Sequence, residues 1–263
     1  MDARVVVDGL GFPESPRWHL GRLYFSDWAA GRVYVLAPDG TADVVAVGTA
    51  FPLCIDFLPD GRLVVVHGSE LRVQQGDELV EYADLSHLSP YAFNDITVHP
   101  SGTVYVNCVG FDFLGGQDPR PGIVVAVTDA GRARQVVGDV LFPNGMAITE
   151  GSLLVAESYR QRITAFDISD DGGVGAARTW AQTPGHHPDG ICLAPDGTLW
   201  YSDVGTTRCV NIAEGGTIRR EVQLDRGAFA CALGEGVLYV TTNTWDGGVD
   251  PNGGHGQLVA VEL

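Results

Sequence analysis

Four short motifs in this chain place an oxygen-bearing side chain where a cation could bind. They centre on Glu14, Asn94, Asn144 and Asp189, and each lies seven or eight residues before a glycine that opens an apolar stretch. Carboxylates that lie close together repel and desolvate one another, so two acids and two amides converging on one point favour a bound cation. Because every donor is an oxygen, calcium, magnesium or manganese fits better than zinc. Calcium is the first expectation, and zinc stays an open alternative.

The glycines that follow these motifs belong to a pattern that occurs six times. Each begins a stretch of apolar residues, at positions 21–27, 61–67, 102–108, 151–157, 197–203 and 236–242. The successive spacings are 40, 41, 49, 46 and 39 residues. This period is typical of propellers, in which each blade is a four-stranded antiparallel sheet, whereas helical repeats of similar length would show a 3.6-residue periodicity. We therefore expect an all-β, six-bladed β-propeller that forms a single domain over residues 1–263.

The fourth repeat shows all the strands of one blade in order. Strands are predicted over residues 145–149, 152–157, 162–168 and 177–181, separated by turns rich in glycine and aspartate. The sixth repeat ends after residues 257–263, which supply only its third strand. We expect residues 4–7 to close the ring as the outer strand of this blade, which removes an exposed sheet edge.

Each motif residue stands where the first strand of its blade begins at the mouth of the central channel. Any one of them could be an ordinary turn residue, but four at equivalent positions favour a site on the axis. The end of each second strand lies beside the start of the first, which brings further candidates to the same end of the ring. Asp203 is predicted to take part in catalysis with Asp189, His67 and Asn94 to bind substrate, and Asp27, Glu157 and Asp95 to support the ligands.

Two segments are longer than a hairpin turn requires. Residues 107–121 include Phe111 and Phe113, and residues 242–256 include Trp245. Loops of this length in a propeller commonly border the mouth of the channel, so these aromatic residues are expected to give the substrate site an apolar lining. Surface loops without a role are the alternative interpretation.

Charge and composition narrow the range of partners. The chain has 33 Asp and Glu against 16 Lys and Arg, a net charge of −17, which excludes a basic face for nucleic acid. It contains no apolar run of the roughly 20 residues that a membrane span requires, and no signal-peptide pattern. Its five cysteines lack a CxxC spacing and are expected to be reduced thiols. A cytoplasmic protein with a small-molecule substrate, monomeric or weakly homo-oligomeric, is expected.

The motifs resemble those of the gluconolactonase, regucalcin and senescence-marker-protein family of six-bladed propellers. The resemblance covers nearly the whole chain and rests on residues 12–16, 93–95, 143–145 and 188–190, with Leu199-Trp200 after the last. It implies a divalent metal held by Glu14, Asn144 and Asp189, with Asn94 near or on the metal. It also implies hydrolysis of lactones or, in related calcium propellers, of organophosphate esters.

The chain departs from this family at one informative position. Sugar-lactone members have an arginine two residues before the Asn-Asp pair, and here that residue is Ala92. A methyl group cannot donate hydrogen bonds to substrate hydroxyls as a guanidinium does. The sequence therefore predicts a substrate less polar than an aldonolactone.

The leading hypothesis is a metal-dependent hydrolase of a cyclic ester. The cation would polarise the carbonyl, and Asp189 would serve as both a ligand and the general base that activates water. Two alternatives remain: a metal-dependent isomerase, cyclase or phosphotriesterase that uses the same site, and a non-catalytic binding propeller with a structural ion.

Overall fold

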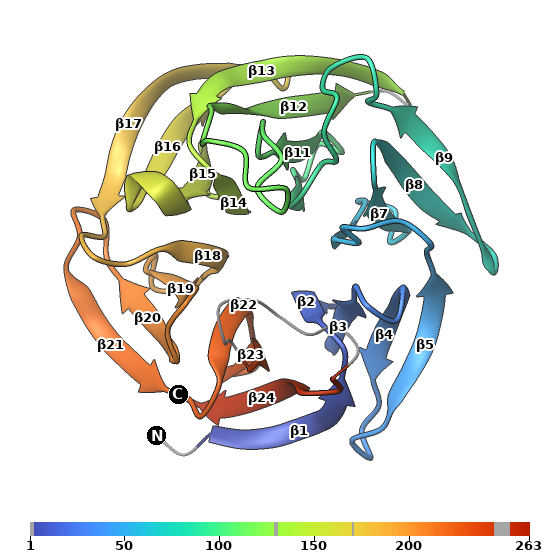
Figure 1. The fold of residues 1–263 in the computed structure, drawn as a ribbon, viewed down its shortest axis with the longest axis vertical. Helices are drawn as coiled ribbons and strands as arrows, with labels where there is room; N and C mark the ends of the chain where they lie inside the picture. Colours follow the sequence, from blue (N-terminus) through green and yellow to red (C-terminus); the bar gives the residue numbers. More distant parts are fainter. Residues whose placement is uncertain (1–2, 129–130, 170, 245–252) are drawn as a thin grey trace.

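Six four-stranded antiparallel sheets form a ring around a central axis (Figure 1). The computed structural model describes residues 3–128, 131–169, 171–244 and 253–263. The predicted all-β, six-bladed propeller with four antiparallel strands in each blade is confirmed. Each blade runs from an inner strand beside the axis to an outer strand at the periphery.

The first three blades follow one another along the chain, and the strands of each run in order from the inside outwards. Blade one has β2 (Pro13–His19), β3 (Arg22–Asp27), β4 (Arg32–Leu36) and β5 (Ala42–Val47). Blade two has β6 (Ile55–Phe57), β7 (Leu63–His67), β8 (Glu70–Gln75) and β9 (Glu78–Asp84). Blade three has β10 (Ile96–Val98), β11 (Val104–Cys108), β12 (Gly122–Thr128) and β13 (Arg132–Val140).

The remaining blades repeat this arrangement. Blade four has β14 (Pro143–Ile148), β15 (Ser152–Glu157), β16 (Arg162–Ile168) and β17 (Val174–Gln182), with the 3-10 turn η1 (Ser158–Arg160) between its middle strands. Blade five has β18 (Pro188–Leu193), β19 (Leu199–Asp203), β20 (Arg208–Ile212) and β21 (Ile218–Gln223). Blade six has β22 (Gly227–Gly234), β23 (Val237–Asn243), β24 (Gly256–Glu262) and the N-terminal β1 (Ala3–Leu10).

The two ends of the chain close the ring in one sheet. Strand β1 pairs antiparallel with β24, and Arg4 lies opposite Ala260. The expected closure by the N-terminal strand is therefore confirmed. It stabilises the ring because β1 covers the outer edge of β24, whose inner edge pairs with β23.

Predicted and observed strands agree closely in blade four. The two middle strands have the expected bounds, while β14 begins two residues earlier than predicted and β17 begins three residues earlier, at Val174. The early start of β14 places Asn144 near the beginning of the strand, within a shift of the pairing register between Pro143 and Met146.

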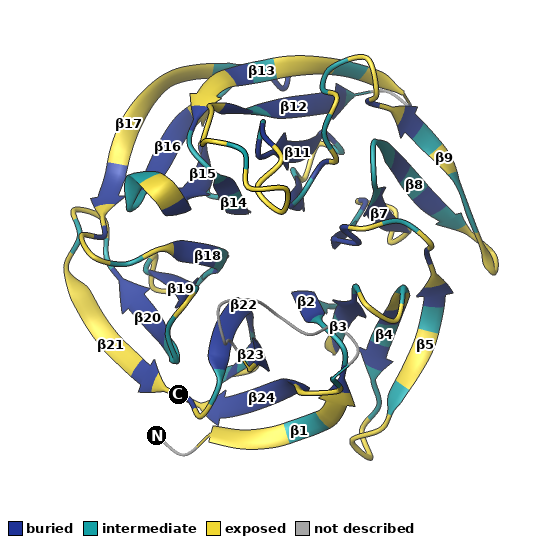
Figure 2. Ribbon diagram, viewed as in Figure 1, coloured by how far each residue is buried: buried dark blue, intermediate teal, exposed yellow. Residues whose placement is uncertain are grey.

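The core lies between adjacent blades and close to the axis. Valines of β7 and β11, among them Val64, Val66, Val104 and Val106, are fully buried against one another. Each such side chain contributes about 1.5–3 kcal/mol by leaving water. Figure 2 shows that the inner and middle strands are mostly buried, whereas exposed residues follow the outer strands β5, β17 and β21.

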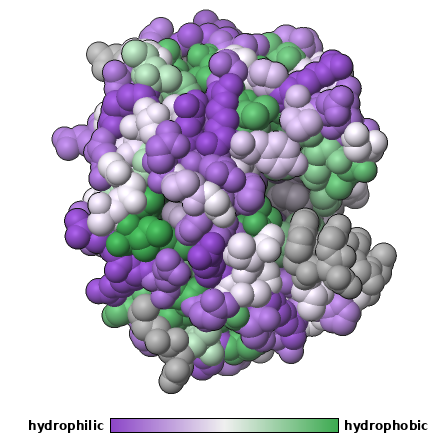
Figure 3. Space-filling model, turned by 60° about the vertical axis from the view of Figure 1, so that its left-hand side comes forward, coloured by the Kyte–Doolittle hydropathy of each residue, from purple (hydrophilic) through white to green (hydrophobic). Residues whose placement is uncertain are grey.

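The surface can be compared with the polar character of the sequence. The face shown in Figure 3 is mostly hydrophilic, and its apolar residues occur in scattered groups. Across the part of the chain that the structure describes, no helix is long and apolar enough to span a membrane.

Candidate metal and active site

The four predicted ligands lie at the inner end of four blades. Glu14 is in β2, Asn144 in β14 and Asp189 in β18, and Asn94 lies just before β10. In blades one, four and five the pairing of the first two strands shifts register at this point, after Glu14, Pro143 and Pro188. Such bulges bend a strand and redirect its side chains. The same local irregularity therefore occurs at or directly after three of the ligand candidates.

The structure brings these four residues into one environment. Asn94 Nδ2 donates a hydrogen bond to Asn144 Oδ1 over 3.4 Å. Gly145, which follows Asn144, lies so close to the backbone of Asp189 that an added Cβ would meet its carbonyl oxygen at 2.5 Å. Glu14 and Asp189 are 7% and 6% exposed, and the negative charge of Glu14 raises the pKa of Asp189.

In the absence of a cation, the ionised forms of the Glu14 and Asp189 carboxylates are electrostatically unfavourable. Burial, opposed by the Ser15 backbone N–H and reinforced by the charge of Asp95, raises the pKa of Glu14 to about 8. Burial, followed by the charges of Glu14 and Asp95, raises the pKa of Asp189 well above its usual value. Within the described residues neither carboxylate forms a salt bridge. A buried acid that lacks a counter-ion is the environment in which a bound divalent cation is stabilising.

The donor chemistry limits which cation fits. Among the described residues, no group of three or more His, Cys, Asp or Glu side chains is placed to hold a metal ion. The axial set instead consists of two carboxylates and two amides, whose oxygens suit a hard cation such as calcium. The residues present therefore fit a divalent metal that prefers oxygen ligands.

Three buried acids hold the segments that lead into the ligand-bearing strands. Asp27 accepts hydrogen bonds from the backbone N–H groups of Gly11 and Phe12, at 2.8 and 2.9 Å. Glu157 accepts a hydrogen bond from the backbone N–H of Leu141 at 2.8 Å. Asp203 accepts one from the backbone N–H of His187 at 2.7 Å. These acids end the second strands of blades one, four and five, so each fixes the chain two or three residues before a ligand.

These contacts redefine the role expected for Asp203. Its carboxylate is fully buried, accepts the His187 N–H and forms a salt bridge with Arg208 at 2.9 Å. Glu157 is engaged in the same way by Arg160 and Arg162. An acid whose oxygens are already occupied in this manner is poorly suited to take a proton from water. We interpret Asp203 as a positioning residue, which leaves Asp189 as the candidate base.

His67 occupies the corresponding position in blade two. Its Nε2 accepts hydrogen bonds from the backbone N–H groups of Thr49 and Ala50, at 3.1 and 3.2 Å. Burial and the nearby Arg72 lower its pKa, which favours the neutral ring that these contacts require. His67 thus holds the segment that leads into the first strand of blade two, as the three buried acids do in blades one, four and five. Its contact with substrate stays a prediction.

An aromatic group lies next to Asn144. Phe111 is buried and Phe113 is 45% exposed, and their rings lie 5.9 and 5.3 Å from that of Phe142. Phe142 also stacks on Tyr159 at 4.5 Å. Tyr159 follows Ser158, whose Oγ lies 3.5 Å from Asn144 Nδ2. The two phenylalanines predicted from the sequence therefore belong to an apolar group that touches the ligand segment.

A second aromatic group lies at the same end of the ring. The ring of Phe12 lies 5.2 Å from Trp28 and 5.1 Å from Phe229, and Trp28 also contacts Phe51. The sequence analysis assigned none of four residues to an aromatic lining: Phe12, Trp28, Phe142 and Tyr159. Their proximity to the motifs was the available signal, since Phe12 and Phe142 each stand two residues before a ligand. Trp245 lies outside the described residues.

Asp95, which the sequence predicts to support the ligands, takes part in a buried network whose other members, Arg17 and Asn107, were not predicted. Its Oδ1 accepts a hydrogen bond from Arg17 at 3.1 Å, and its Oδ2 accepts one from the backbone N–H of Met146 at 3.0 Å. Asn107 adds a bond to the Asn144 carbonyl at 2.7 Å. Blades one, three and four are therefore tied together directly beside the candidate ligands.

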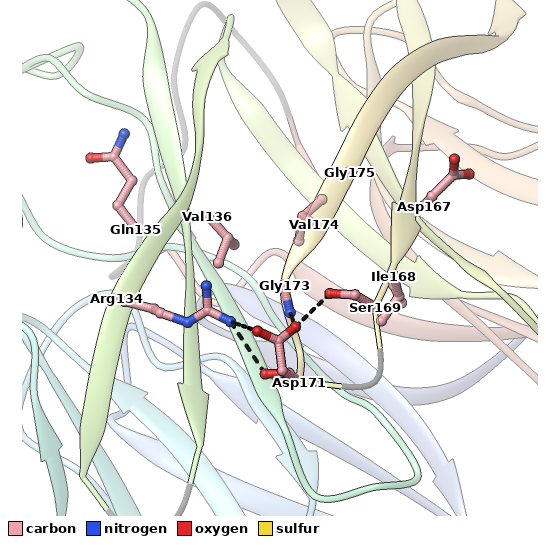
Figure 4. Close-up of a pocket in the computed structure, with 10 residues that line it drawn as sticks. All are labelled: Arg134, Gln135, Val136, Asp167, Ile168, Ser169, Asp171, Gly173, Val174 and Gly175. Carbon is pink, nitrogen blue, oxygen red and sulfur yellow. Dashed lines mark hydrogen bonds and ion pairs between the residues drawn. The ribbon is translucent and has the colours of Figure 1, made fainter.

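Two surface hollows in the described part of the chain lie away from the axis. They have volumes of about 350 Å³ each and adjoin one another at the periphery between β13 and the strands β16 and β17. Figure 4 shows one of them, in which Arg134 reaches Asp171, an exposed pair. The side chains lining these hollows include no predicted ligand, and the buried acids and amides at the axis make the axis the stronger candidate site.

Comparison with known proteins identifies the family. Residues 12–244 match the family described as the SMP-30/Gluconolactonase/LRE-like region. The chain belongs to this family. The match extends from the segment before Glu14 to the end of β23, and so includes all four candidate ligands.

Individual relatives agree with this assignment. The chain is 28% identical to pentonolactonase XacC of Haloferax volcanii, over 96% of this chain and 88% of that protein. It is 25% identical to a 6-deoxy-6-sulfogluconolactonase of Pseudomonas putida, over 80% of this chain and 75% of that one. A calcium-binding protein, regucalcin, from Agrobacterium tumefaciens has the same fold, with a TM-score of 0.81, 16% identity and coverage of 100% and 94%.

Gly145 provides a test of the close approach between blades four and five. We expect Gly145→Ala to lower the free energy of unfolding by about 1–3 kcal/mol, because the added Cβ forces the Asp189 strand away. Thermal unfolding measures this effect. Gly151→Ala is the matched control, since an added Cβ there meets nothing within 4 Å. Equal melting temperatures for the two variants would contradict the packing described.

The raised pKa of Glu14 predicts how stability depends on pH in metal-free protein. Between its ordinary value of 4.5 and about 8, the folded protein holds a proton that the unfolded chain releases. The free energy of unfolding should therefore fall as pH rises across this range. Thermal melts in chelator should show a decline that is smaller in Glu14→Gln and unchanged in a variant of the exposed Glu78. An identical slope in wild type and Glu14→Gln would be inconsistent with this electrostatic account.

Proposed function

We propose that this protein is a metal-dependent lactonase that opens a cyclic ester at the propeller axis. The observation that supports this most directly is the buried pair Glu14 and Asp189, which lacks a cationic partner within the described residues. Two relatives in the same family are a pentonolactonase and a 6-deoxy-6-sulfogluconolactonase. Lactone hydrolysis is the chemistry that these observations have in common.

Four residues would hold the cation. Glu14 and Asp189 would provide charge, and Asn94 and Asn144 would provide amide oxygens, with calcium as first choice and magnesium, manganese or zinc as alternatives. The bound cation would supply Lewis-acid polarisation of the ester carbonyl. The contacts of Asp27, Glu157 and Asp203 would keep the ligand segments in place while the substrate is converted to product.

Asp189 would act as the general base. One of its carboxylate oxygens would accept a proton from the attacking water, which adds its oxygen to the carbonyl carbon. The proton would then pass to the ring oxygen as the acyl–oxygen bond breaks, giving an open-chain hydroxy acid. A buried, sparingly hydrated carboxylate is a stronger base than an exposed one, because burial favours its protonated form.

The substrate is proposed to be less polar than a sugar lactone. Ala92 is exposed beside the buried Phe93 and provides no hydrogen-bond donor for substrate hydroxyls. Phe113 and Tyr159 are exposed members of the aromatic group next to Asn144. Apolar side chains near the reacting centre favour a lactone with an alkyl or aryl substituent.

The role of Asp189 is tested by Asp189→Asn. We expect kcat on a hydrolysable lactone to fall by about 10²–10⁴-fold, the usual contribution of a general base, with a further loss from weakened metal binding. Asp196→Asn is a suitable control, because Asp196 is an exposed turn residue of the same blade. Should Asp189→Asn bind metal and retain the wild-type rate, Asp189 is not the base.

The substrate class is tested with a panel of lactones. An alkyl-substituted γ-lactone should have a kcat/KM at least about tenfold above that of an aldonolactone, since burying about 50 Å² of apolar surface is worth roughly 1.4 kcal/mol. Phe142→Ala should raise KM for the alkyl lactone more than for the aldonolactone. Leu20→Ala, at an exposed turn, serves as the control. A preference for the aldonolactone would refute the substrate class and leave lactone hydrolysis itself intact.

A further inference from the structure

Arg17 provides a fixed positive charge beside the axial acids. It lies in β2, three residues after Glu14, and is held in one orientation by carbonyl groups as well as by a carboxylate. Its Nη2 donates to Asp95 Oδ1 at 3.1 Å and to the Ile96 carbonyl at 2.8 Å, and its Nη1 donates to the Pro16 carbonyl at 3.0 Å. The side chain is only 18% exposed. A guanidinium stays charged in such a place, so its position determines the local field.

The charge of Arg17 acts on several acids. It stabilises the ionised forms of Glu14 and of Asp56, and so opposes the effect of burial on the pKa of each. Asp56 is held separately, by the backbone N–H groups of Phe57 and Val98 at 2.8 Å each. Asp95, in contrast, raises the pKa of both Glu14 and Asp189. The Arg17–Asp95 pair thus places one positive and one negative charge next to the two unpaired carboxylates.

We infer that Arg17 sets the charge of the axial site so that a divalent cation is favoured over a trivalent one. This inference rests on the proposed function, because it concerns the cation that Glu14 and Asp189 would hold. The charge of Asp95 is offset by that of Arg17, so Glu14 and Asp189 are the carboxylates left to bind the cation directly, and their two negative charges would match a divalent ion. Arg17 is a positioning residue in this proposal, since it acts on the cation through the field and through Asp95.

Electrostatics distinguishes this role from simple packing. The energy between a fixed charge and a bound ion is proportional to the charge of the ion. Loss of the guanidinium charge therefore favours a trivalent ion more than a divalent ion of similar size. Loss of packing alone moves or loosens the ligands and weakens both ions in the same direction. The ratio of the two affinities reports the charge effect specifically.

The test compares calcium with terbium on the full-length protein. Terbium is trivalent and close in size to calcium, and its luminescence and its displacement by calcium give both affinities without any measurement of activity. In Arg17→Met we expect the preference for terbium over calcium to rise about tenfold or more. Two controls should keep this preference within about threefold of wild type. Arg17→Lys retains the positive charge, and Arg220→Met alters an exposed arginine of β21.

The reverse change provides an independent test. Asparagine has nearly the same shape as aspartate but carries no charge. In Asp95→Asn the positive charge of Arg17 is therefore no longer offset, and the preference for terbium over calcium should fall below that of wild type. If Arg17→Met does not fold, the ratio of affinities measured in Asp95→Asn tests the inference. An unchanged ratio in either folded variant, with both ions still bound, overturns the inference about Arg17 and leaves the metal site intact. A wild-type protein that binds neither ion overturns the metal site and the inference together.

Discussion

The repulsion between buried carboxylates at the axis is the constraint on which the site depends. Glu14 and Asp189 come from blades one and five, yet after burial itself the negative charge of Glu14 is what raises the pKa of Asp189. A flexible pair of strands would separate and hydrate them. The ring prevents this, because its closure by β1 and β24 and the close contact of Gly145 with the Asp189 backbone leave the blades little freedom. The fold thus holds an unfavourable arrangement of charge that a bound cation would relieve.

Acids of the same type have opposite roles in this molecule because their surroundings differ. Asp189 and Asp203 belong to the two innermost strands of blade five, and both are buried. Asp203 meets a backbone N–H and a guanidinium, which stabilise its charge and fix its orientation. Asp189 has a neighbouring acid in place of a guanidinium. The first arrangement holds the chain in place, whereas the second leaves a carboxylate available to a ligand and to a proton.

Much of the fold could be predicted because the blades of a propeller repeat in the sequence with a regular period. Repeated glycines located the strands of blade four almost to the residue, and the shared position of Glu14, Asn144 and Asp189 followed from aligning the repeats. Contacts between blades could not be predicted in this way. Arg17 lies 78 residues from Asp95, and no periodicity relates an arginine in one blade to an acid in another. Similarly, the saturated contacts of Asp203 depend on its neighbours in space.

In the proposed site, the charge of the cation and the shape of the substrate would be selected by different residues. Arg17 and Asp95 lie one to three residues after a ligand candidate and would act on the charge of the cation. Phe142 and Tyr159 flank the ligand segment at the mouth, where they would meet the substituents of a substrate. Because the two groups share no hydrogen bond or ion pair in the described part of the chain, a change at Ala92 or Phe142 would alter the accepted lactone and preserve the field at the axis. Such a separation would let one propeller keep its buried acids while it accommodates different cyclic esters.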